Sequence, residues 1–241
     1  MKNDFFHDLY MSIRDVRVRD CSAMLLSHLL HGYLSVYAMV RVSPTLEREY
    51  GTLQEIHERL REIAKELSKA MKDTSIELDE RIGYVADLMD AYQTYSDMDL
   101  LNEALDVAYR VLTVDEQGEI VIPGRTPNVC RLLCNWYYFT GEEWCLKMAE
   151  EVISLHINNE DRLDWIRAVN NLRDFVDKCV FISMNESERL KDELFHMKKN
   201  REERYEGVDN KTYYFEVLAI QEYEFFTLCE RKDLLERYTV I

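Results

Sequence analysis

Two aspartates and a tyrosine on one expected helix are the first residues that could carry chemistry. Asp87 and Asp90 are three positions apart, and Tyr84 stands nearly one turn before Asp87. Paired carboxylates can act as acid and base when their surroundings separate their pKa values. The buried stripe of this helix contains Val85 and Leu88, however, and at helical spacing both aspartates project away from that stripe. We therefore interpret them as part of a solvated face, with an acid–base pair as the alternative.

Histidines and cysteines at helical spacing could hold a metal ion or act as nucleophiles. His28 and His31 are at i and i+3, and Cys130 and Cys134 are at i and i+4, with Cys145 further along the chain. A metal site needs further ligands, and the spacing fixes none for either pair. No Cys–His–Asp order for nucleophilic catalysis is evident. The favoured interpretation is histidines satisfied in the core and thiols buried between helices, so we expect neither a metal nor a cofactor.

A cationic and polar group follows Pro123-Gly124 and opens another expected helix. It consists of Arg125, Asn128 and Arg131, in a chain whose formal net charge is −16. A helix N-terminus combined with arginine favours anionic groups. Pairing with acids of an adjacent helix pair is the competing explanation.

Aromatic side chains concentrate in two places. The first group is Trp136, Tyr137, Tyr138, Phe139 and Trp144, and the second is Tyr213, Tyr214, Phe215, Tyr223, Phe225 and Phe226. Consecutive aromatic residues cannot all face one side of a helix, so some must meet a neighbouring helix pair or a groove. Core packing is the favoured interpretation, and a platform for sugars or peptides is the alternative. The candidate ligand-binding residues are therefore Tyr84, Asp87, Arg125, Asn128, Arg131 and Trp136, and no catalytic residue is assigned.

The elements that must position these residues are helices. Seven glycines and three prolines in 241 residues are too few for the turns of an all-β fold, and 47% hydrophobic residues exclude disorder. Five breaks recur every 44 or 45 residues, and an aliphatic residue stands five positions after each. The breaks are Gly51, Ser96, Gly141, Asn185 and Glu230, followed by Ile56, Leu101, Leu146, Leu190 and Leu235. The interval predicts helical hairpins of about 45 residues that stack, because one hairpin cannot bury its apolar face alone.

Local signals agree with this layout. Residues 52–55 form a capping box, Thr126 precedes a proline at a helix start, and Gly141 follows a helix end. We expect a short helix over about 4–17 and hairpins over about 19–72, 77–114, 127–157, 159–204 and 208–240. The first hairpin should be irregular at Ser43-Pro44. Two β-branched runs around a Gly118 turn predict a small β-hairpin insertion near 111–122. The fold class is thus all-α, an α/α superhelix or partial toroid in a single helical-repeat domain, residues 1–241.

One stretch resembles a known family. The pattern is Thr126-Pro127-Asn128 … Leu132-Leu133 … Tyr137 … Thr140-Gly141-Glu142-Glu143 … Leu146 … Ala149-Glu150. It is similar to the helix hairpins of six-hairpin (α/α-toroid) glycosidase-like proteins, where an aromatic residue, a Thr-Gly-Asp/Glu turn and a Leu-xx-Ala run recur. The resemblance is best over residues 82–157. It implies a carbohydrate-active hydrolase fold, but five units are fewer than a six-hairpin ring, and no catalytic carboxylate of the family matches here.

Charge and motif content narrow the function. A charge of −16 repels phosphate backbones, so we expect no nucleic-acid partner. The uncharged stretch 21–40 is expected to be a buried central helix rather than a membrane span, and six cysteines suit reduced thiols in the cytoplasm. The sequence predicts a non-catalytic helical-repeat scaffold that binds a peptide, a protein or itself as a homo-oligomer. The alternative is a carbohydrate-active hydrolase-like protein of the α/α-toroid type, so catalysis is left open.

Overall fold

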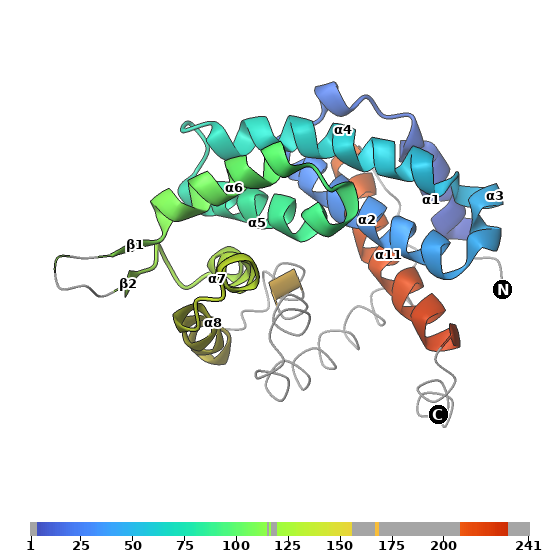
Figure 1. Ribbon diagram of the computed structural model, residues 1–241. Coiled ribbons are helices and arrows are strands. Elements are labelled where there is room, and N and C mark those ends of the chain that lie inside the picture. Colours follow the sequence, from blue (N-terminus) through green and yellow to red (C-terminus); the bar gives the residue numbers. More distant parts are fainter. Residues whose placement is uncertain (1–3, 115, 117–119, 156–166, 169–207, 231–241) are drawn as a thin grey trace. The chain divides into compact units, whose positions relative to one another are not determined.

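A computed structural model describes residues 4–114, 116, 120–155, 167–168 and 208–230 (Figure 1). In this part of the chain the protein is all-α, and its nine α-helices pack in neighbouring pairs. The chain divides into two compact units. The first unit is residues 1–66 with 198–241, and the second unit is residues 67–197. That residues 1–241 form a single helical-repeat domain remains a prediction.

The first unit is built from both ends of the sequence. Its helices are α1 (Asp4–Arg14), α2 (Ala23–Val42), α3 (Glu47–Tyr50), most of α4 (Leu53–Lys72) and α11 (Val208–Glu230), with 3-10 turns at Val18–Asp20 and Pro44–Leu46. Figure 1 shows α11, in red, running beside α2, and α11 also packs on α1. The irregularity predicted at Ser43-Pro44 is confirmed, because α2 ends there and a 3-10 turn leads into α3.

A glycine lets α2 and α11 approach closely. The Phe215 ring of α11 lies over Gly32 of α2, where a Cβ atom would stand 2.3 Å from the Phe215 Cε1 atom. The same ring contacts Phe6, Tyr10 and Tyr33, with centroid distances between 5.5 and 5.9 Å. All four aromatic side chains are almost fully buried. The core of the first unit is therefore an aromatic cluster, and the Phe215 ring in it leaves no room for a side chain at position 32.

The second unit consists of two helical hairpins. The first pairs α5 (Leu78–Tyr95) with α6 (Met98–Val111), and the second pairs α7 (Pro127–Thr140) with α8 (Trp144–Leu155). The first helices of the two hairpins, α5 and α7, pack against each other. Between the hairpins, β1 (Thr113–Val114) and β2 (Ile120–Val121) form a short antiparallel ladder in which Val114 pairs with Ile120. This ladder lies in the predicted 111–122 segment, although most of the turn lies outside the described residues.

Three of the five predicted breaks are confirmed. Gly51, Ser96 and Gly141 all have positive φ angles, of 95°, 52° and 75°, and each separates two helices. Ser96 is the one non-glycine residue with positive φ in the described ranges. The predicted break at Asn185 lies outside those ranges. The predicted break at Glu230 coincides with the last described residue of α11, and the residues after it lie outside the described ranges. Helices therefore end at the 45-residue interval that the sequence predicts.

The predicted caps also form. The backbone N–H of Thr52 donates to the Glu55 carboxylate at 2.7 Å, and the Glu55 N–H donates to the Thr52 hydroxyl at 3.2 Å. Thr126 accepts the Val129 N–H at the start of α7. The aliphatic residues after the three described breaks are buried, with Ile56 2% exposed. The hairpins predicted over 159–204 and beyond Glu230 lie outside the described residues, and the predicted 4–17 helix ends at Arg14.

One described helix, α2, is long and apolar enough to cross a membrane by length and composition, and 61% of its apolar window is buried inside the structure.

We expect Gly32→Ala to destabilise the protein by about 1–3 kcal/mol, because the added methyl group would overlap the buried Phe215 ring. In the interior of a helix, replacing glycine by alanine normally stabilises the protein by about 1 kcal/mol, so a loss of stability here would be opposite to the usual effect. Chemical denaturation measures the difference. Gly124→Ala is the matched control, since its nearest neighbour would be 3.8 Å from the new Cβ atom. A Gly32→Ala protein as stable as wild type would contradict the close approach.

Candidate functional site

A buried guanidinium joins α5 to α7. The side chain of Arg131 on α7 is fully buried, and its Nη2 atom donates to Asp87 Oδ1 and to Asp90 Oδ2, each at 2.6 Å. Asp87 is 1% exposed. Asn135, one turn beyond Arg131, donates from Nδ2 to the second oxygen of Asp90 at 2.7 Å. We call these four residues the buried charge cluster.

The buried charge cluster corrects the prediction that Asp87 and Asp90 form a solvated face. Helical spacing places them opposite the apolar stripe of α5, but α7 covers that side as well and supplies the compensating charge. A buried carboxylate is tolerated only with such a partner. Arg131 therefore pairs with acids of the adjacent helix pair, which was the competing explanation for this residue.

Electrostatics tie the members of this cluster to one another. Burial lowers the pKa of Arg131, as does the charge of Arg167, but Asp87 and Asp90 outweigh both, so the pKa of the guanidinium is raised. The Tyr84 hydroxyl has its pKa raised to about 12, first by burial and then by the charges of Glu80 and Asp87. The tyrosine is therefore neutral at physiological pH. The structure brings three candidate residues together here: Tyr84, Asp87 and Arg131.

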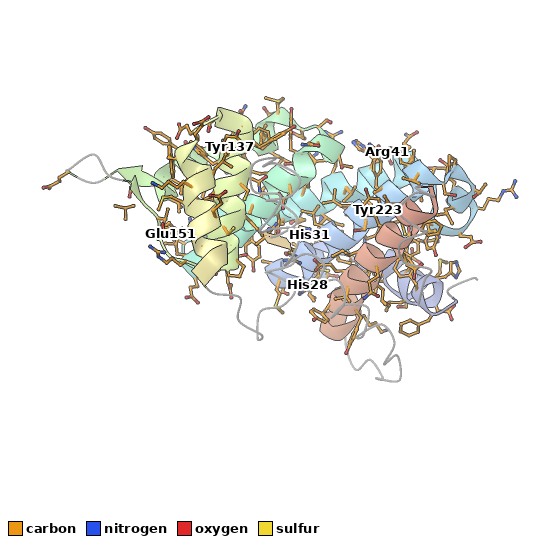
Figure 2. All side chains as sticks on the ribbon, turned by 90° about the horizontal axis from the view of Figure 1, so that it is seen from below. His28, His31, Arg41, Tyr137, Glu151 and Tyr223 are labelled. Carbon is orange, nitrogen blue, oxygen red and sulfur yellow. The ribbon has the colours of Figure 1, made fainter. Side chains whose placement is uncertain are left out.

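The other cationic and polar candidates are also engaged by acids. Asn128 donates to the Asp79 carboxylate at 3.0 Å and lies directly against Gly83, where a Cβ atom would be 2.9 Å from the amide oxygen. Arg125 pairs with Glu151 of α8 at 2.7 Å in a half-exposed ion pair, and Figure 2 labels Glu151. The N-terminus of α7 thus faces protein carboxylates, which explains why arginine and asparagine stand there.

Trp136 belongs to a different feature, at the ends of the two hairpins. Its indole N–H donates to Glu142 Oε2 at 3.3 Å, and the Trp144 N–H donates to the same oxygen at 2.5 Å. The Tyr109 ring of α6 packs on Trp136 with 6.4 Å between centroids. One carboxylate at the α7–α8 turn is thus held between two indole rings.

The aromatic contacts continue from this turn to the neighbouring one. Phe139 contacts Tyr138 at 5.0 Å and Tyr92 at 5.9 Å between centroids, and the Tyr92 hydroxyl donates to the Met98 sulfur at 2.7 Å. Tyr109 is 70% exposed and Tyr138 is 47% exposed. We call this set the turn-end aromatic surface, and its members are Tyr92, Tyr109, Trp136, Tyr138, Phe139 and Trp144. Core packing, the favoured interpretation for this group, accounts for Trp136 but not for the exposed tyrosines.

The candidate histidine and cysteine side chains contact neighbouring helices. His28 of α2 lies with its Nδ1 atom 2.6 Å from Glu216 of α11, so the acidic partner that the sequence did not show comes from 188 residues away. Figure 2 shows His28 and His31 on α2. The buried Cys130 thiol donates to a backbone carbonyl of α8, and burial, then the charge of Glu142, raises the pKa of Cys145 to about 12. Among the described residues, no group of three His, Cys, Asp or Glu could hold a metal ion.

Comparison of the chain with protein-family models, with curated proteins and with solved structures gave no match. The resemblance to six-hairpin proteins therefore stays a prediction.

We expect Arg131→Met to cost about 3–5 kcal/mol of unfolding free energy, because it removes the guanidinium that binds the buried Asp87 carboxylate. Denaturant unfolding followed by circular dichroism measures this. Arg125→Met is the matched control: it removes a half-exposed ion pair from the same stretch of chain and should cost under about 1 kcal/mol. Equal losses in the two variants would show that the buried charge cluster does not hold α5 and α7 together.

Proposed function

We propose that this protein is a non-catalytic helical-repeat scaffold that binds another protein through its turn-end aromatic surface. The observation that carries the proposal is the exposure of large aromatic side chains beside ring contacts between the two hairpins: Tyr109, 70% exposed, packs on Trp136, and Tyr138, 47% exposed, packs on Phe139. Tyrosine and tryptophan are enriched at protein interfaces because they offer large rigid contact area at low entropic cost. The stacking of the hairpins as an α/α superhelix or partial toroid is part of this proposal.

Rigidity supports the use of this surface for binding. Its residues come from α5, α6, α7 and the start of α8, and the buried charge cluster fixes α5 against α7. Exposed apolar side chains that occur singly need no explanation, whereas a connected patch marks an interaction site. Ring contacts from Tyr92 through Phe139 to Tyr138 make this patch connected across two hairpins.

The negative charge around the turn-end aromatic surface favours a basic partner. Residues 92–99 and 136–147, which carry this surface apart from Tyr109, contain Asp97, Asp99, Glu142 and Glu143 but only one basic residue, Lys147. Arg110, which follows Tyr109, pairs with Asp106. A second copy of the chain would bring the same acidic surface, and its net charge of −16, against the first. A partner segment that combines basic with apolar side chains complements the surface in both respects.

The buried charge cluster argues against the carbohydrate-active alternative. Asp87 and Asp90 are the paired carboxylates of α5, and Arg131 binds both of them. A glycosidase acid and base must flank the scissile bond of a sugar, which Asp87 cannot do while 1% exposed.

The proposal is tested by selecting short random peptides on phage against the full protein, with counter-selection against a Tyr109→Ser/Tyr138→Ser variant. We expect the retained peptides to be rich in basic and apolar residues and to bind wild type at micromolar affinity. The double variant should bind them at least about tenfold more weakly, since it loses two exposed aromatic anchors.

Met24→Ser is the matched control, because Met24 is 53% exposed but belongs to the first unit. It should bind the selected peptides like wild type. The proposal fails if no peptide distinguishes wild type from the double variant, or if both variants lose binding equally. Binding of oligosaccharides at this surface in place of peptides would favour the carbohydrate alternative.

A further inference from the structure

Glu142 occupies an unusual position within the turn-end aromatic surface. Its Oε2 atom accepts both indole N–H groups, at 3.3 Å from Trp136 and 2.5 Å from Trp144. The residue is exposed, and in the described part of the chain neither a hydrogen bond to its Oε1 atom nor an ion pair with a lysine, arginine or histidine is formed. Two indole donors therefore hold one oxygen of this exposed carboxylate.

The fixed orientation matters for recognition. A surface carboxylate normally loses side-chain freedom when it forms an ion pair, which cancels much of the gain. The two indole N–H groups already restrict Glu142, so a cation that binds it meets a pre-organised acceptor. The partly exposed Trp144 ring adds a second attraction, because the face of an indole ring is electron-rich and attracts cations.

The three side chains together favour a guanidinium over other cations. A planar guanidinium can donate to a carboxylate and stack on an aromatic ring in the same pose, whereas an ammonium is a strongly hydrated point charge. The Tyr109 ring packs on Trp136 and supports that indole from the side of α6.

We infer that Glu142, Trp136 and Trp144 form a recognition point for an arginine side chain of the partner protein. This inference rests on the proposed function and specifies the residue that the partner must present. The arginine donates to Glu142 and lies against the partly exposed Trp144 ring, while a neighbouring apolar side chain of the partner packs on the exposed Tyr109, which lies on Trp136.

The test uses the full protein and three synthetic peptides: acetyl-Leu-Arg-Leu-Arg-Leu-amide, its lysine counterpart and its citrulline counterpart. Citrulline keeps the shape of arginine but carries no charge. Binding is followed by NMR through the indole N–H resonances of Trp136 and Trp144, assigned with Trp→Phe variants. We expect the arginine peptide to shift both resonances and to bind about fivefold to tenfold more tightly than the citrulline peptide, with the lysine peptide in between.

Glu142→Gln is the decisive variant, because glutamine still offers an acceptor oxygen to both indoles but carries no charge. It should bring the affinity for the arginine peptide down to that for the citrulline peptide. Glu143→Gln is the matched control, since it removes the same charge from the next residue and should change the affinity less than about twofold.

The outcomes separate this inference from the proposed function. Equal losses in the two variants, equal affinity for arginine and citrulline, or an arginine peptide that leaves both indole resonances in place would each overturn the arginine assignment. The phage selection judges the surface independently: peptides that distinguish wild type from the double tyrosine variant but are insensitive to Glu142→Gln would sustain the surface and reject the arginine site.

Discussion

The buried guanidinium of Arg131 joins the two hairpins of the second unit. Arg131 binds two carboxylates of α5, and the side chains of Arg131 and Asp87 are almost fully buried, where water cannot replace a lost partner. Because the charges have to meet, α5 and α7 are held in one register. A core of leucine and alanine alone would permit small slips between the two helices at little cost. Removing one member of the buried charge cluster is costly because it leaves an uncompensated charge between the two helices.

That register is fixed at three levels along the helices. Asn128 meets Asp79 near the start of both helices, Arg131 meets Asp87 and Asp90 in the middle, and the ring of Phe139 meets that of Tyr92 near the end. The paired residues are separated by 41 to 49 positions in the sequence. These separations scatter around the 45-residue repeat, so each contact joins nearly equivalent positions of successive hairpins. The contact between Phe139 and Tyr92 follows from this, since two turns in register bring these aromatic residues side by side.

The first unit depends on a different constraint, the contact between chain ends. Phe215 fills the space that Gly32 leaves, and His28 pairs with the fully buried Glu216 on the same two helices. Neither interaction involves neighbouring repeats. A chain that stacked its hairpins only in sequence order would leave the polar Glu216 and the large Phe215 without these partners. Association of α2 with α11 is thus a long-range contact, and it pairs residues whose partners the sequence did not indicate.

The sequence by itself determined the helices, the turns and the spacing of the hairpins. Gly51, Ser96 and Gly141 end helices for local reasons, and Thr52 and Thr126 cap them through bonds within a few residues. Only the tertiary structure decided which charges are buried: Asp87 looks solvated on its own helix and is enclosed once Arg131 arrives from 44 residues away. The same holds for Glu142, whose two indole donors depend on how the α7–α8 turn folds back. Hydrogen bonds within a turn are encoded in adjacent residues, whereas the partner of a buried charge depends on which surface of another helix covers it.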